Sequence, residues 1–370
     1  MNLSRFASDP KTAQNQISRW FHFFATSCHR RGENSIRRIA FPQPRFVKAG
    51  AISPDSRPLL WAAAEQVRSA NLEALHHTDK ELRRRLASLT KPLEGAPSAT
   101  DRAFLVDRAK VAPEAAMEAL ALAHGASVTS LFLAGERHER LALVIEHVAE
   151  LAELAAEEGT RSVGEKALAS GKSKLPERLE GGEPHPMIWL GHHLIRRWVT
   201  IHQVYFATMS AAALAMRLAR AALEAGHEER GLIFTGVAEA LLRDGVELFS
   251  LTPTGLRYRL FLRPYMASIA PGLSGGEGTE HQVFIQDYRR LISFDSDRPC
   301  VMAALGTLRG SYALAFDHHR TVCAHAVGQQ NGSLKNPDHG APEVLGKLKA
   351  SRTSRCPMHR FLNLFTSQSK

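Results

Sequence analysis

Cysteine, aromatic residues and long apolar runs are all scarce in this chain. Its 370 residues include four cysteines, Cys28, Cys300, Cys323 and Cys356, and only 7% aromatic residues. So few cysteines exclude the disulfide-rich scaffold of a small secreted protein. No uninterrupted apolar run reaches the roughly 18 residues that cross a bilayer, and the first residues lack the apolar core of a signal peptide. We therefore expect a cytoplasmic protein with no membrane attachment.

Acidic residues are also scarce, but only at the two ends of the chain. The formal net charge is +10, from 47 Lys and Arg against 37 Asp and Glu. Residues 1–58 carry a net +7 and residues 347–370 a net +6, which leaves −3 for the body between them. A nucleic-acid partner bound by these ends would lose affinity steeply as salt rises. The acidic body and the lack of a recognisable DNA-reading motif argue against such a partner.

The composition divides the chain into three parts. We expect a basic N-terminal arm at 1–57, a helical domain at 58–352 and a basic tail at 353–370. The arm is rich in arginine and broken by prolines. An arginine-rich, acid-poor start is also typical of an organelle transit segment, and composition does not decide between the two.

Apolar residues recur at three- and four-residue spacings along almost the whole body, which is the pattern of amphipathic helices. No convincing alternation typical of strands is found. The expected fold class is all-α, a large globule of about ten helices. The expected helices include Leu59–Leu89, Pro113–His124, Val128–Glu158, Met187–His227, Leu232–Leu251, Thr254–Ile269, Glu280–Ser293, Arg298–Gln330 and Pro342–Arg352.

Histidine is the titratable residue type that stands out, with 18 copies. His319 and Cys323 are four residues apart, which puts them on one face of a helix, roughly 6 Å apart along its axis. An imidazole at 319 could ligate a heme iron, and a thiol at 323 could add to a vinyl group of the macrocycle. The usual attachment motif, Cys-x-x-Cys-His, is absent. The adjacent His318 leaves the ligand ambiguous, although only His319 has a cysteine four residues on.

The surroundings of His319 resemble a known superfamily. The helix that ends there, the glycine-containing loop at 328–340 and the helix after it resemble the C-terminal part of tryptophan and indoleamine 2,3-dioxygenases. The stretch 201–205 is similar to their distal His-Gln-x-Tyr stretch, and 260–265 and 284–288 look like the pyrrolnitrin-pathway member. The dioxygenases' Gly-Thr-Gly-Gly loop is missing, which argues against an indole ring-opening reaction.

A closer resemblance is to the heme-dependent aromatic oxygenases of this superfamily, in particular the 3-methyl-L-tyrosine hydroxylases of saframycin biosynthesis. Those enzymes carry a histidine well before a His-x-x-x-Cys motif. Here His281 precedes His319 with 37 residues between them, and Cys323 completes the motif. The resemblance covers 187–352 and implies that the helical domain at 58–352 is a heme-binding catalytic domain. It implies a heme held between helices, with His319 as proximal ligand, His281 as distal ligand and Cys323 in a single thioether.

The same resemblance implies an oxidoreductase, a peroxygenase or monooxygenase acting on a small aromatic amino acid. It would convert 3-methyl-L-tyrosine to 5-hydroxy-3-methyl-L-tyrosine in tetrahydroisoquinoline antibiotic biosynthesis, with hydrogen peroxide or with dioxygen and a reductant. Because two imidazoles saturate the iron, His281 would have to leave during catalysis. His202 or the freed His281 would accept the phenolic proton, and His202, Tyr205 and Arg263 would contact the substrate.

Plainer interpretations stay open for the same residues. Cys323 could fill a core, His281 could hydrogen-bond at a helix start, His202 could be a core histidine, and Arg263 could extend to solvent. For the whole protein, a bis-histidine heme sensor or electron carrier would have the same ligands without catalysis. The assembly state is open as well, with a homodimer among the options.

Overall fold

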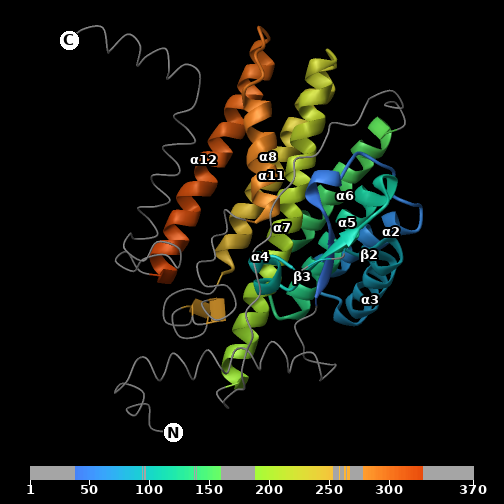
Figure 1. Ribbon diagram of the computed structural model, residues 1–370, viewed down its shortest axis with the longest axis vertical. Helices are drawn as coiled ribbons and strands as arrows, with labels where there is room; N and C mark the ends of the chain where they lie inside the picture. The colour runs from blue at the N-terminus through green and yellow to red at the C-terminus, as the bar shows by residue number, and fades with distance from the viewer. Residues whose placement is uncertain are drawn as a thin grey trace, which may run out of the picture.

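The computed structural model describes residues 38–93, 95, 97–136, 138, 140–159, 188–252, 258, 262–263, 265–266 and 278–327 (Figure 1). Among these residues the fold is mostly helical, as the sequence predicts, and it also contains one small sheet that the sequence pattern does not reveal. The α-helices are α2 (Ser56–Arg68), α3 (Leu72–Leu89), α4 (Ala99–Ala103), α5 (Ala116–Leu133), α6 (Arg140–Gly159), α7 (Ile188–Glu224), α8 (Glu228–Ser250), α11 (Thr279–Ile292) and α12 (Pro299–Val327). The strands are β1 (Ile39–Pro42), β2 (Lys91–Pro92) and β3 (Val106–Lys110).

Two alanine-rich helices, α5 and α7, form the centre of the fold. Pro113–Leu133 and Leu194–Glu224 are long and apolar enough to cross a membrane by length and composition, but 89% of each apolar window is buried inside the protein. Helices α2, α3 and α6 pack around α5, and α8 and α11 pack on α7 (Figure 1). Scattered polar residues interrupt both apolar helices, so a search for unbroken apolar runs misses them.

The sheet joins the start of the described chain to the core. β1 runs parallel to β3, with Phe41 opposite Arg108, and β2 pairs antiparallel on the other side of β3. Ile39 and Phe41 are fully buried. Arg217 of α7 also donates to the carbonyl of Val47 at 3.0 Å. The expected boundary after residue 57 is therefore corrected: residues 38–57 belong to the body, because alternate apolar side chains of this proline-containing segment enter the core.

Helix boundaries also differ from the sequence-based expectation. The stretch Leu59–Leu89 is two helices, because Ala70 adopts a φ of 54° and Asn71 starts α3 by accepting a hydrogen bond from the Ala74 amide. The next break falls at 134–139, after α5, and not near residue 126. The expected helices Thr254–Ile269 and Pro342–Arg352, the loop at 328–340 and the tail at 353–370 lie largely or wholly outside the described residues.

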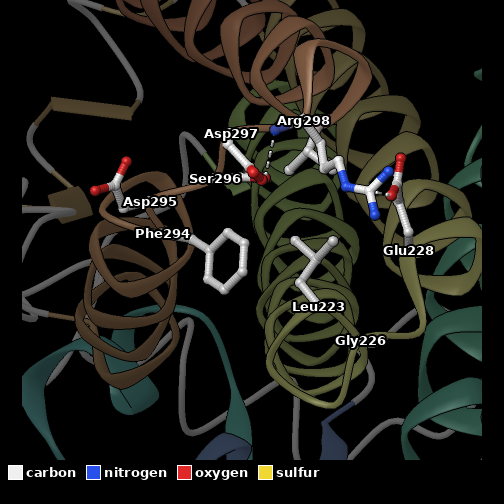
Figure 2. Close-up of a pocket in the computed structure, with 9 residues that line it drawn as sticks. Leu223, Gly226, Glu228, Phe294, Asp295, Ser296, Asp297 and Arg298 are labelled. Carbon is white, nitrogen blue, oxygen red and sulfur yellow. Dashed lines mark hydrogen bonds and ion pairs between the residues drawn. The ribbon is translucent and has the colours of Figure 1, made fainter.

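Two helical hairpins set the position of the histidines. The turn between α7 and α8 and the turn between α11 and α12 line one cavity of about 500 Å³, which Figure 2 shows with Leu223 and Gly226 on one side and Phe294 on the other. Both turns therefore lie at the same end of the molecule. It follows that the C-terminal end of α8, the N-terminal end of α11 and the C-terminal end of α12 all lie toward the opposite end, beside the N-terminal half of α7 (Figure 1).

The crossing of α7 and α8 gives a test of this packing. A Cβ added at Gly231 would lie 2.5 Å from Cγ of Leu223, whereas one added at Gly236 meets nothing within 4 Å. Overpacking lowers the free energy of unfolding by about 1–3 kcal/mol, while replacing an unstrained helical glycine by alanine raises it by up to about 1 kcal/mol. We expect Gly231→Ala to lower the free energy of unfolding and Gly236→Ala to raise it, measured by urea denaturation. Equal effects of the two substitutions would contradict the packing described.

Candidate functional site

An aromatic cage surrounds His202 on α7. The ring of Phe104, which follows α4, stacks on the imidazole with 4.5 Å between centroids and 12° between planes. Trp198, one turn earlier on α7, contacts the same imidazole at 4.4 Å. The backbone of Phe104 is held in place as well, because the side-chain amide of Gln203 donates to its carbonyl at 2.9 Å. The imidazole therefore has a fixed orientation inside apolar walls.

Hydrogen bonding selects one tautomer of His202. Its Nδ1 lies 2.8 Å from the carbonyl oxygen of Trp198, and a carbonyl can only accept, so Nδ1 carries the proton. Nε2 then presents a lone pair and has no hydrogen-bond partner among the described residues. Burial lowers the pKa of His202 to about 4, and the nearby His319 shifts it the same way. At neutral pH the ring is uncharged and able to accept a proton.

His319 lies on α12 and faces α8. Its ring stacks on Phe249 with 4.8 Å between centroids and 12° between planes, and no hydrogen bond to either ring nitrogen is found among the described residues. Burial lowers the pKa of His319 to about 4, with a further contribution from the charge of His318. The adjacent His318 has a buried Nε2 with no partner in the described part of the chain. A neutral imidazole with an unused nitrogen is the form that binds a metal.

Tyr205 completes this part of the site. Its ring lies 4.6 Å from that of Phe249 between centroids, so a chain of ring contacts runs from Trp198 through His202, Phe206, Tyr205 and Phe249 to His319. Gly245 makes room for it, since a Cβ there would lie 3.4 Å from Cε2 of Tyr205. The structure thus brings His202, Tyr205 and His319 into one region, although 117 residues of sequence separate the two histidines.

Aromatic side chains also show how α11 and α12 face each other. Tyr288 lies 4.2 Å from Tyr312 between ring centroids, and Phe284 lies 5.8 Å from the same ring. The helices are antiparallel, because a short turn joins them. His281 is seven residues before Tyr288 and His319 is seven residues after Tyr312, so each lies two helical turns, about 10 Å, farther along the same face. Extended by these two turns, the register predicts that His281 and His319 lie at one level of the hairpin.

The remaining predicted residues are only partly described. Cys323 lies one turn beyond His319 on α12, but the structure does not describe the side chain of Cys323. Arg263 is partly buried in a segment of which few residues are described. Sequence reasoning did not identify Phe104 and Phe249 as site residues. Trp198 could have been found, because it lies four residues before His202 on one helix face, whereas Phe104 and Phe249 reach the site only through tertiary packing.

Comparison with known proteins now identifies the group to which this fold belongs. Residues 41–303 match the family described as SfmD 3-methyl-L-tyrosine peroxygenase. The chain belongs to this family. The match includes His202, Arg263 and His281 and ends before His319 and Cys323.

Two members of the SfmD peroxygenase family can be compared directly. The 3-methyl-L-tyrosine peroxygenase of Streptomyces lavendulae is 29% identical over 177 residues, which are 44% of this chain and 47% of that protein. The chain thus matches about half the length of this curated relative. A crystal structure of reduced SfmD, soaked with sodium hydrosulfite, aligns over 77% of this chain and 97% of its own, with 22% identity and a TM-score of 0.43.

The protonation states of the site can be tested by NMR on the heme-free protein with labelled histidine. The pKa of His202 is lowered to about 4 by burial, whereas that of His147 is raised because its Nδ1 donates to Asp244. As pH is lowered, we expect His147 to become charged first and to be charged at pH 5, while His202 stays neutral there with its proton on Nδ1. His202→Gln and His147→Gln variants assign the signals. Simultaneous titration of the two rings would contradict the environments described.

Proposed function

We propose that this protein is a heme-dependent peroxygenase that hydroxylates a phenolic amino acid, 3-methyl-L-tyrosine or a close derivative, ortho to its hydroxyl group. The register of α11 and α12, from which His281 and His319 are expected at one level of the hairpin, supports this proposal in a member of the SfmD family. The product would enter tetrahydroisoquinoline antibiotic biosynthesis, and the cytoplasm is the proposed location.

The described residues fit a heme in three respects. His319 is neutral at pH 7 and has no hydrogen bond to its ring nitrogens among these residues, so it can serve as a proximal ligand. The walls beside it, Phe249 and Tyr205, are flat and aromatic, as a macrocycle requires. Finally, Cys323 follows His319 by one helical turn, a spacing that suits a single thioether to a heme ligated by His319.

Each residue has a distinct role in this proposal. His319 and His281 would be the residues that ligate the heme iron, and Cys323 would keep the heme attached through a thioether without help from His281. The heme, when bound, supplies the activation of hydrogen peroxide, or of dioxygen with a reductant, for transfer of one oxygen atom. With peroxide the balance is simple: the phenol gains one oxygen and one water is released.

His202 is the proposed proton acceptor. Its Nε2 carries a lone pair, because Nδ1 is committed to the carbonyl of Trp198. The phenolic proton can pass to this nitrogen as oxygen is added to the ring. Loss of this proton makes the ring more electron-rich at the ortho carbon. Stacking on Phe104 and a tilted contact with Trp198 keep the base in place. Tyr205 contacts the substrate ring, and Arg263 pairs with its carboxylate.

Attachment of the heme can be measured by intact mass under denaturing conditions. We expect the heme-loaded protein to carry a heme-sized mass increment that survives denaturation and is lost in Cys323→Ala. Cys300→Ala is the matched control, since Cys300 is an exposed cysteine on the same helix whose Sγ contacts Glu228. A wild-type protein that releases all its heme on denaturation would exclude the thioether.

Catalysis can be measured by adding hydrogen peroxide to the heme-loaded protein with 3-methyl-L-tyrosine or tyrosine and detecting the catechol. Loss of a positioned proton acceptor costs about 100-fold or more, so we expect His202→Gln to reduce kcat by about that factor. His325→Gln is the control, because His325 is an exposed histidine of α12 whose Nδ1 donates to the carbonyl of Thr321. A bis-histidine spectrum without catechol would favour a sensor or electron carrier.

A further inference from the structure

A buried ionic cluster lies directly beside His281. Arg108 of β3 donates from both terminal nitrogens to the carboxylate of Glu280, the residue before His281, with a distance of 3.1 Å for the Nη2–Oε2 pair. Arg108 Nη2 also lies 2.5 Å from Oδ1 of Asp101. The side chains of Glu280 and Arg108 are only 1% and 10% exposed. The cluster joins the sheet to the first turn of α11 across 172 residues of sequence.

Arg108 keeps its positive charge inside the cluster. Burial by itself would lower the pKa of Arg108, but the charges and hydrogen bonds of Glu280 and Asp101 raise it above its ordinary value. The guanidinium therefore stays cationic at any pH at which the protein is folded. Its planar fork matches a carboxylate with two parallel hydrogen bonds, a geometry that an ammonium group cannot reproduce.

The first turn of α11 needs such a tether. Its N-cap is Gly278, which offers no side chain to accept from the free amides of the first turn. Helix starts without a cap tend to fray. Glu280 is the acidic residue of this turn, and the bidentate pair with Arg108 connects it to a strand that is itself paired on both sides. His281, one residue on, takes its position from the same turn.

Helix α4 also contacts Arg108, through Asp101. Asp101 accepts hydrogen bonds from the backbone and the hydroxyl of Ser98 through Oδ2, which forms the capping box of α4, and its Oδ1 faces Arg108. Phe104, which stacks on His202, follows the same helix. One short segment from α4 to β3 therefore contacts the surroundings of both His202 and His281.

We propose that Arg108 is a positioning residue that acts through Glu280 to hold the distal ligand His281 at the heme. This inference rests on the proposed function, because it takes His281 as that ligand. A buried ion pair contributes little net stability compared with apolar residues of similar size, since its desolvation offsets its attraction. What it does supply is a fixed place for the carboxylate, and with it a fixed height and rotation for the first turn of α11.

The first experiment compares ferric, heme-loaded wild type with Glu280→Gln and Arg108→Lys. Both substitutions keep the approximate shape and remove the bidentate ionic contact. We expect a larger high-spin fraction in the absorption and EPR spectra, and azide binding faster by about tenfold, as the loss of one charge-assisted contact would give. The matched control is Arg38→Gln, which removes an exposed ion pair from Arg38 to Asp107 on the same strand. Spectra and azide rates equal to those of the wild type in both variants would overturn the proposal.

The second experiment needs no heme. In the heme-free protein, the Gln282 amide donates to the carbonyl of Gly278 at 3.1 Å, so its hydrogen exchange reports on the first turn. We expect exchange at this amide to accelerate in Arg108→Lys and Glu280→Gln but not in Arg38→Gln, while exchange in α7 stays unchanged. Equal acceleration throughout the protein would indicate a purely structural role and contradict the proposal.

His281→Ala separates this inference from the proposed function. If the wild type is low-spin, and His281→Ala becomes high-spin while the Arg108 and Glu280 variants stay low-spin, only the positioning role is wrong. If His281→Ala leaves the wild-type spectrum unchanged, the distal-ligand assignment fails, and the positioning role that depends on it fails too.

Discussion

Partial burial of two imidazoles between long helices is the constraint on which the rest of the site depends. Aromatic rings pack against both His202 and His319, and the resulting desolvation lowers the pKa of each so that both are uncharged near neutral pH. A neutral imidazole can bind a metal or accept a proton, whereas the charged form can do neither. The stacked rings of Phe104 and Phe249 then fix where each imidazole points. The chemistry proposed for this protein therefore begins with desolvation.

The helical hairpins supply the geometry for that burial. Because α7–α8 and α11–α12 turn at the same end, side chains far apart in sequence meet toward the other end. Tyr288 and Tyr312 fill the space between α11 and α12 in the middle of the second hairpin. Two turns farther along both helices, the same faces carry His281 and His319. The equal spacing of the two histidines from these two tyrosines thus predicts that they lie at the same level.

The small sheet has a larger part in the site than its size suggests. It buries the segment at 38–57 that composition assigned to a basic arm, and its strand β3 carries Arg108 into a buried contact with Glu280. The loop before β3 presents Phe104 to His202. Short strands of this kind leave little alternation to detect: β2 has two residues, and β1 contains a proline.

The sequence alone determined the helical class, the approximate extent of the long helices and the histidine–cysteine motif, because helical periodicity and motif spacing are local properties of a chain. It also pointed to His202, Tyr205, His281 and His319 through a family resemblance. Only the tertiary structure decided that Phe249 stacks on His319, that Phe104 covers His202 and that Arg108 reaches Glu280. These contacts join segments 70 to 172 residues apart, and no local pattern encodes which distant side chain will fill a given space.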